Sequence, residues 1–155
     1  MASFDFELVK GHQVASGLAN DARFVIGTIA LQLPFFNRLG LNLDNYHRAT
    51  LNAQFNCKEV ILNYVDYHFT QVKWHRDLPA EDFRFCRCQV LHANQAYSSI
   101  IYQPMAETKT EHFQPKNQLE ILAPFIDNIH YGDICRLVVT EKALSFVQFK
   151  EPKPS

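Results

Sequence analysis

The fold is decided by the strand-like stretch at residues 82–91, which reads Asp82-Phe83-Arg84-Phe85-Cys86-Arg87-Cys88-Gln89-Val90-Leu91. Successive side chains of a strand point to opposite faces, so Phe83 and Phe85 share one face. The other face carries Cys86, Cys88 and Val90. A change of apolar phase inside one strand indicates either a β-bulge or burial on both faces.

Apolar and β-branched runs on both sides of this stretch predict further strands. They lie at residues 6–16, 49–55, 59–65, 69–74, 97–102, 119–122, 134–139 and 144–149. We expect the last two to pair through a turn near Glu141 and Lys142. The thirteen Phe and six Tyr agree with this reading, because aromatic side chains favour pleated, half-buried surfaces.

Residues 28–39 follow a helical period instead, with Ile29, Leu33 and Phe36 on one face. Pro34 inside this pattern predicts a helix that is kinked, broken or late in starting. Gly40 is expected to end it. One helix among many short strands predicts a mainly β fold, either a sandwich or a closed barrel.

The length and composition favour one globular domain over residues 1–155, with a frayed tail at residues 150–155. Hydrophobic residues make up 47% of the chain and charged residues 20%, and the net charge is −1. A nucleic-acid partner is not expected, because such binders carry a basic excess. No signal-peptide pattern and no apolar run long enough for a membrane span are visible, which predicts a cytoplasmic protein without a membrane partner.

The four cysteines are Cys57, Cys86, Cys88 and Cys135. A cytoplasmic setting predicts reduced thiols. Cys86 and Cys88 share a strand face, and we weigh two buried core thiols against a zinc site that only the fold could assemble. The chain holds no Gly-x-Ser-x-Gly elbow and no phosphate-binding P-loop motif.

The first candidate site is the segment Tyr46-His47-Arg48-Ala49-Thr50-Leu51-Asn52. On an extended strand, Thr50 and Asn52 point the same way while Leu51 turns toward the core. A hydroxyl and an amide oxygen at this spacing can bind Mg²⁺, which prefers oxygen ligands. The alternative is an ordinary strand end with both side chains solvated or bonded to backbone.

Two further segments carry candidate ligand contacts. Residues 11–19 end a strand in Gly17 and small residues, so backbone N–H groups there can approach a phosphate, with Arg23 nearby to supply charge. A plain β-turn is the alternative. Residues 104–124 begin with a long polar loop that includes His112, a possible ligand contact. Glu120 follows the loop on a mostly apolar strand, so it either faces outward or has a partner.

Taken in order, these segments resemble the archaeal CTP-dependent riboflavin kinases. The resemblance covers most of the chain, from Gly11 to Val139, and rests on four segments. They are Val14-Ala15-Ser16-Gly17-Leu18, then Tyr46 with Ala49-Thr50-Leu51-Asn52, then Leu119-Glu120-Ile121-Leu122-Ala123-Pro124, and Tyr131-Gly132-Asp133. It implies a small closed six-stranded cradle-loop barrel that phosphorylates riboflavin to FMN, with CTP or another nucleotide as the donor.

The resemblance also implies roles for single residues. Thr50 and Asn52 match the family's magnesium ligands, and Glu120 matches a glutamate near the flavin, where it can accept the hydroxyl proton. Thr108 or Thr110 matches a threonine on the flavin side. The nucleotide loop matches Gly17, Leu18, Ala19, Asn20 and Arg23.

The chain departs from the family pattern on the nucleotide side. Ala19, Asn20, Asp21 and Ala22 stand where the family has glycines, Ala49 replaces the glycine before Thr50, and residues 125–130 lack an arginine. Two alternatives therefore stay open. One is a barrel that binds flavin or nucleotide without phosphoryl transfer. The other is a protein-interaction module, with dimerisation through an uncovered sheet edge as one form.

Overall fold

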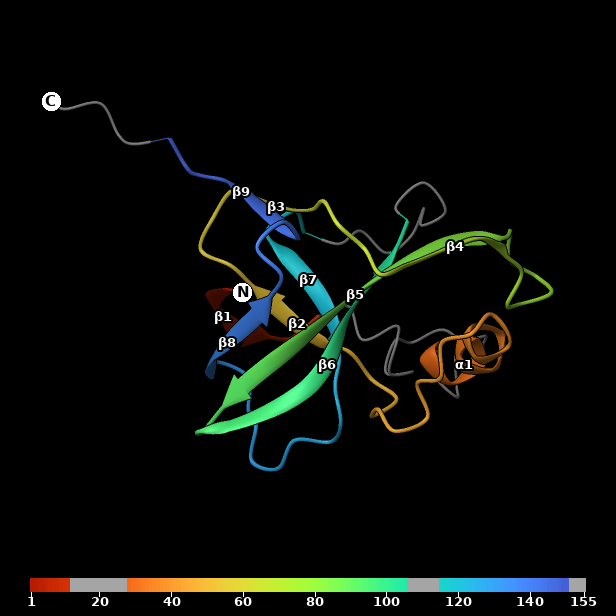
Figure 1. Cartoon of the computed structure of the whole chain (residues 1–155), viewed down its shortest axis with the longest axis horizontal. Coiled ribbons are helices and arrows are strands. Elements are labelled where there is room, and N and C mark those ends of the chain that lie inside the picture. The colour runs from red at the N-terminus through yellow and green to blue at the C-terminus, as the bar shows by residue number, and fades with distance from the viewer. Residues whose placement is uncertain (12–27, 106–114, 151–155) are drawn as a thin grey trace, which may run out of the picture.

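The computed structural model of the protein describes residues 1–11, 28–105 and 115–150. Over these residues the chain forms one helix and nine strands (Figure 1). The helix is α1 (Thr28–Arg38). The strands are β1 (Ala2–Val9), β2 (Leu51–Gln54), β3 (Glu59–Leu62), β4 (Tyr67–Val72), β5 (Glu81–His92), β6 (Gln95–Pro104), β7 (Gln118–Leu122), β8 (Ile134–Val139) and β9 (Leu144–Val147). The mainly β class with a single helix is confirmed.

Six strands close into a ring. Seven strands form one antiparallel sheet in the order β4-β5-β6-β7-β2-β1-β8, and β8 pairs in addition with β5. The closing register joins Gln89 to Val138, Val90 to Leu137 and Leu91 to Arg136. β4 extends the sheet outside the ring, and β3 with β9 forms a separate two-stranded sheet. Pairing around the ring leaves its members few free edges, which limits edge-to-edge association.

The predicted pairing of the last two strands is wrong. A turn does join them, with the Ala143 N–H donating to the Thr140 carbonyl at 3.0 Å. However, β1 and β5 occupy the two edges of β8, so β9 pairs instead with β3.

β1 also differs from its predicted range. It begins at Ala2, where it pairs with Val139 of β8, and it ends at Val9. The predicted strand at residues 6–16 therefore starts too late. Its last five residues, 12–16, lie outside the described part of the chain.

β5 buries one face in its first half and the opposite face in its second half, which explains the change of phase in its sequence. Phe83 and Phe85 face α1, whereas Cys86 and Val90 face the inside of the ring. The pairing of β5 with β6 runs without interruption from Phe83 to His92, so no bulge causes the change on that side. The irregularity lies in β4, next to Gln71, whose φ is 55°.

α1 packs on the outer face of the sheet through Phe36, which is fully buried. Its ring lies 4.9 Å from that of Phe83 and 5.0 Å from that of Phe85, both edge-on. The helix runs unbroken past Pro34, which sits on its exposed side.

Gly40 ends α1 as predicted. It adopts a φ of 101°, the left-handed conformation that glycine accepts without a steric penalty. The N–H groups of Gly40 and Leu41 donate to the carbonyls of Asn37 and Phe36, at 3.1 and 2.9 Å. These two bonds define a Schellman motif.

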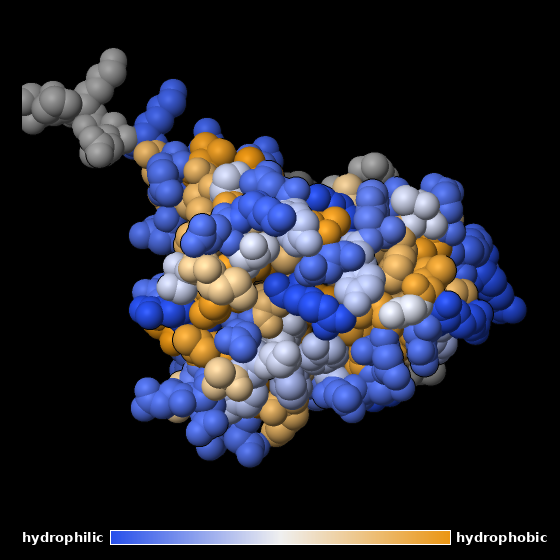
Figure 2. Space-filling model, viewed as in Figure 1, coloured by the Kyte–Doolittle hydropathy of each residue, from blue (hydrophilic) through white to orange (hydrophobic). Residues whose placement is uncertain are grey.

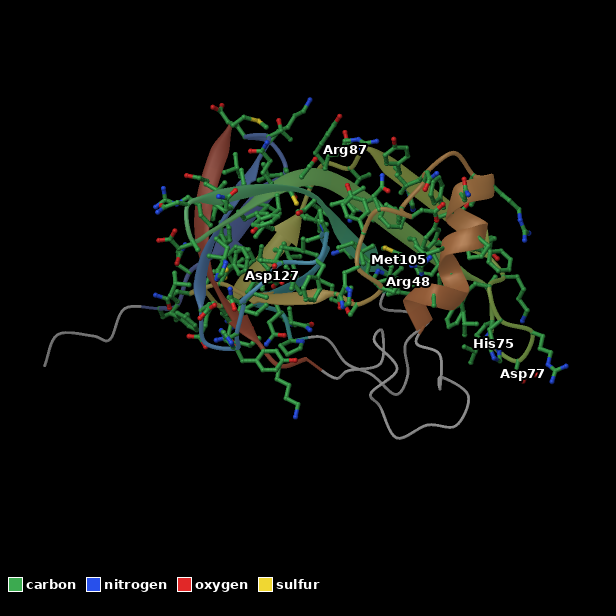
Figure 3. All side chains as sticks on the ribbon, turned by 90° about the horizontal axis from the view of Figure 1, so that it is seen from below. Arg48, His75, Asp77, Arg87, Met105 and Asp127 are labelled. Carbon is green, nitrogen blue, oxygen red and sulfur yellow. The ribbon has the colours of Figure 1, made fainter. Side chains whose placement is uncertain are left out.

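Apolar side chains form two clusters, one inside the ring and one between the sheet and α1. We call them the interior cluster and the helix cluster. Figure 3 shows α1 beside the strands of the ring, with the described side chains as sticks. All four cysteines lie in the interior cluster as buried, free thiols. Burial raises the pKa of Cys86 and of Cys135 to about 11.

The exposed surface is mixed. On the face shown in Figure 2, hydrophilic residues surround apolar patches over α1 and β4 and near β3 and β9. Ile61, Val147 and Phe149 are among the exposed apolar side chains. No helix within the described ranges is long and apolar enough to cross a membrane.

Replacing Phe36 tests the contact between α1 and the sheet. Because its ring is fully buried against two other rings, Phe36→Ala should lower the free energy of unfolding by about 3–5 kcal/mol. Phe125 is 67% exposed, so Phe125→Ala should change stability by no more than about 0.5 kcal/mol. Urea denaturation followed by the fluorescence of Trp74, the single tryptophan, measures both. Equal losses in the two variants would contradict this packing.

Candidate functional site

Thr50, Asn52 and Glu120 meet on one face of the sheet. Asn52 in β2 lies directly opposite Glu120 in β7, and directly opposed residues of an antiparallel pair share a face. The Thr50 hydroxyl, one residue before β2, donates to Oε1 of Glu120 at 3.2 Å. All three side chains are half-buried. The two predicted metal ligands and the predicted carboxylate, far apart in sequence, are therefore neighbours.

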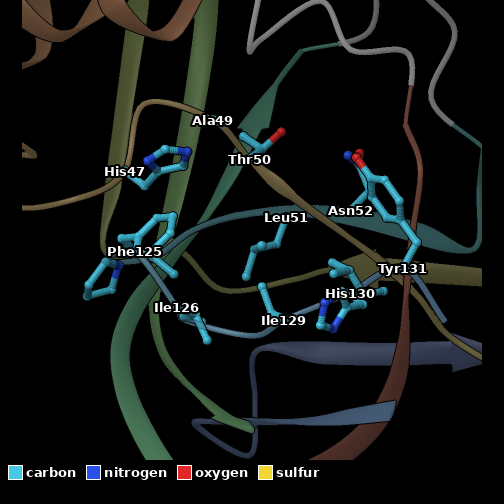
Figure 4. A pocket seen from close by; sticks show the side chains of 13 residues that line it. His47, Ala49, Thr50, Leu51, Asn52, Phe125, Ile126, Ile129, His130 and Tyr131 are labelled. Atoms are coloured by element: carbon cyan, nitrogen blue, oxygen red, sulfur yellow. The ribbon is translucent and has the colours of Figure 1, made fainter. Parts of the chain in front are cut away.

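Leu51 points to the opposite side of the same strand. Figure 4 shows the Thr50 and Asn52 side chains on one side of the backbone and Leu51 on the other. Leu51 packs against the interior cluster, in line with its predicted direction. It stays half-buried because a pocket opens beside it.

Gly11 lies against the side chain of Asn52. A Cβ atom at Gly11 would lie 2.5 Å from Cγ and from Oδ1 of Asn52, well inside van der Waals contact. The glycine therefore lets the backbone approach the Asn52 amide, and any larger residue would displace it.

A pocket of about 390 Å³ lies along the segment at residues 47–52. Its volume falls in the range of small-molecule sites, about 300–1,000 Å³. The lining is mostly apolar and comes from β1, from residues 47–52 and from residues 123–131. The lining residues are Leu8, His47, Ala49, Thr50, Leu51, Asn52, Ala123, Pro124, Phe125, Ile126, Ile129, His130 and Tyr131.

Three backbone hydrogen bonds hold the walls of this pocket together. The His47 N–H donates to the Ala123 carbonyl at 2.8 Å, and the Gly132 N–H donates to the Leu8 carbonyl at 2.7 Å. The Leu8 N–H in turn donates to the Asp133 carbonyl at 2.9 Å. Three of the four family-like segments therefore surround one cavity, the exception being residues 14–18, which lie outside the described ranges.

Aromatic side chains line the rim of the pocket. The rings of His47 and Phe125 are 5.5 Å apart, edge to face. Phe125 and Tyr131 are 67% and 63% exposed. Planar side chains of this kind offer stacking surfaces to a flat ligand ring. The sequence analysis named Tyr131 only as part of the turn at residues 131–133 and Phe125 only as part of a segment without an arginine, and it predicted neither as a ligand contact.

Asp133 shapes the turn that carries His130 and Tyr131. Its Oδ2 accepts the His130 backbone N–H at 2.9 Å and lies 2.9 Å from Nε2 of His92. The hydrogen bond from His130, reinforced by the one from His92, lowers the pKa of the Asp133 carboxyl below its usual value. The sequence predicted the turn but not this pairing, because His92 is 41 residues away.

Tyr102 lies beside Glu120 and bonds to Gln32, and the sequence singled out neither residue. Tyr102 in β6 lies directly opposite Glu120, and its hydroxyl donates to Oε1 of Gln32 at 2.7 Å. A polar Gln32 within the apolar stripe of α1 was the available signal.

The donor set fits magnesium. Thr50 and Asn52 supply a hydroxyl and an amide oxygen on the face that they share with Glu120, and Mg²⁺ prefers oxygen ligands. Within residues 1–11, 28–105 and 115–150, no group of three or more His, Cys, Asp or Glu can hold a metal ion. A site built largely from the neutral oxygens of Thr50 and Asn52 would not belong to such a group.

The remaining predicted contacts lie outside the described residues. They are Gly17, Leu18, Ala19, Asn20 and Arg23 of the expected nucleotide loop, and Thr108, Thr110 and His112 of the long polar loop. The described chain resumes at Thr28 and at Pro115.

In comparisons with protein-family models and with curated proteins, no family and no curated protein matches this chain. What the protein does must therefore be inferred from its own residues.

Replacing Gly11 tests its contact with Asn52. The new Cβ in Gly11→Ala should push the Asn52 amide aside at little cost, because a side-chain end can move, so the free energy of unfolding should change by less than about 1 kcal/mol. The Asn52 side-chain NH₂ signals in ¹⁵N NMR spectra should shift. The neighbouring Lys10→Ala should leave them in place. Unmoved Asn52 signals in Gly11→Ala would refute the contact.

Acid should weaken the turn at Asp133. A carboxyl whose folded pKa is depressed stabilises the folded state above its unfolded pKa, and this contribution is lost as the pH falls through the folded pKa. The Tm of the wild type should therefore drop more steeply than that of Asp133→Asn as the pH falls from about 5 to about 2. Circular dichroism measures both curves. An NMR titration that gives Asp133 a pKa of 3.8 or higher would contradict the hydrogen bonding described.

Proposed function

We propose that this protein is a riboflavin kinase-like phosphotransferase, which moves a phosphoryl group from a nucleoside triphosphate to riboflavin and forms FMN. CTP is the expected donor. The observation that carries the proposal is that Thr50, Asn52 and Glu120 are neighbours. Thr50 and Glu120 are 70 residues apart in sequence. These three residues are at the positions to which the resemblance assigns the metal and the reacting hydroxyl.

The fold supports the same proposal. Six strands of the sheet form a closed ring, which agrees with the six-stranded cradle-loop barrel that the resemblance implies. Fold alone does not define an activity, because one fold hosts many functions. The proposal therefore rests mainly on the site residues.

The two sides of the β2 segment would bind different ligands. The aromatic-rimmed pocket beside Leu51 takes the base of the donor nucleotide, since its planar side chains suit a flat ring. Riboflavin lies on the face of Thr50, Asn52 and Glu120. The segment between them is where donor and acceptor would come together.

The chemistry requires mostly positioning and charge neutralisation. Glu120 accepts the proton of the ribityl hydroxyl as that oxygen bonds to the γ-phosphorus of the donor and the bond to the leaving nucleoside diphosphate breaks. Thr50 and Asn52 would hold magnesium beside Glu120. Bound magnesium supplies positive charge against the phosphate oxygens.

The second candidate is a barrel that binds flavin or nucleotide without transfer. Its support is the set of departures on the nucleotide side, which includes Asp21 and Ala49 in the place of glycines. The protein-interaction module is the third reading. The three make different predictions for one set of purified reagents.

The activity test combines the protein with riboflavin, MgCl₂ and either CTP or ATP, with FMN measured by chromatography. The wild type should form FMN, and Glu120→Gln should lower kcat by about 10²–10⁴-fold, as expected for loss of a proton acceptor. Thr50→Val removes one oxygen at nearly constant volume, so it should raise the Mg²⁺ concentration needed for half-maximal rate.

Thr70→Val is the matched control, because Thr70 is an exposed threonine of β4, and it should behave as the wild type. Flavin or nucleotide binding without FMN would support the second candidate. If neither ligand binds in calorimetry, both proposals fail and the interaction module remains.

A further inference from the structure

A buried tyrosine stands beside Glu120 beneath α1. Tyr102 in β6 is paired with Glu120 across the sheet and is only 3% exposed. Its hydroxyl donates to Oε1 of Gln32 at 2.7 Å. Gln32, in α1, is itself 2% exposed. The helix is therefore linked through Gln32 to Tyr102, which lies directly opposite Glu120, the acceptor of the Thr50 hydroxyl.

This polar pair lies in an otherwise apolar interface. Tyr102 belongs to the helix cluster, with Phe83, Phe85 and Leu122 as neighbours. Burying a hydroxyl and an amide here is unfavourable unless they bond to each other, and the net gain of such a bond is only about 1 kcal/mol. A phenylalanine and a leucine would fill the same space, so stability alone does not account for the pair.

The neighbouring carboxylate gives the pair a role. Directly opposed side chains on adjacent strands have Cβ atoms about 4.5–5.5 Å apart, so the Tyr102 ring forms one wall beside Glu120. A glutamate side chain has three rotatable bonds and can point in several directions. A fixed ring on one side and the Thr50 hydroxyl on the other restrict that choice.

Tyr102 does not compete for the proton in this arrangement. Burial, and then the negative charge of Glu120, raise the pKa of the Tyr102 hydroxyl well above its usual value. The group stays neutral at any ordinary pH. It acts on Glu120 through contact and not through its own ionisation.

We infer that Tyr102, fixed by Gln32, is a positioning residue that keeps the Glu120 carboxylate directed at Thr50 and Asn52, and that it ties this placement to the seating of α1. The kinetic consequence rests on the proposed function. The placement itself does not.

The kinetic test uses Tyr102→Phe, which keeps the ring and removes the hydroxyl, and Gln32→Leu, which removes its partner. Each should lower kcat for FMN formation about tenfold or more while KM for either substrate changes less than about twofold, since a misplaced catalytic group impairs the chemical step. In a Glu120→Gln background, Tyr102→Phe should cause no further loss. A further loss there would mean that Tyr102 acts independently of Glu120 and would overturn the inference.

A second measurement does not depend on activity. The carboxyl ¹³C signal of Glu120, assigned by its disappearance in Glu120→Gln, should move in Tyr102→Phe and in Gln32→Leu. It should stay in place in Tyr97→Phe, a half-buried tyrosine of the same strand that packs in the interior cluster. An unmoved signal in both test variants overturns the inference even if FMN is formed. If the wild type forms no FMN, the proposed function fails and this comparison alone decides the inference.

Discussion

The closure of the ring and the packing of α1 both depend on one edge of β5, which pairs with two strands, β4 and β8. Along that edge β4 pairs with residues near Phe83 and Phe85, and β8 pairs farther on, at Gln89 to Leu91. The β8 contact closes the ring, whereas the β4 contact carries the sheet past it to where α1 can pack. β5 must therefore bury one face at its start and the other at its end. The alternating burial of its side chains, with the change at Phe85 and Cys86, is the result.

The site lies where these two regions meet. Register places Tyr102, Glu120 and Asn52 in one row across β6, β7 and β2. Tyr102 belongs to the helix cluster, whereas Leu51, next to Asn52, packs on the interior cluster. Polar groups at the boundary of two apolar clusters can keep hydrogen bonds and some contact with water, which a central position would deny them. The half-burial of Thr50, Asn52 and Glu120 is consistent with such a boundary.

Local pattern predicted much of the fold and little of its assembly. The range of β8 and the end of α1 at Gly40 followed from side-chain period and helix-stop chemistry. The partner of β9 did not, because it depended on whether the edges of β8 were already occupied. At the site, the common direction of Thr50 and Asn52 followed from strand geometry. Glu120 stood out as a carboxylate on an apolar strand, and the resemblance gave its expected role. The bonds from Tyr102 to Gln32 and from His92 to Asp133 join distant residues, and no local pattern encodes such pairs.

The pairing of Ala2 with Val139 has a consequence for how the chain reaches this state. β1 lies between β2 and β8 in the ring, so β1 cannot complete its pairing until β8, which lies far along the chain, is also in place. Contacts of such long sequence separation form slowly, because loop-closure entropy must be overcome first. Until then β1 has an open edge and the ring cannot close. An intermediate in which β1 still exposes this edge is thus expected to be the species most open to misassociation.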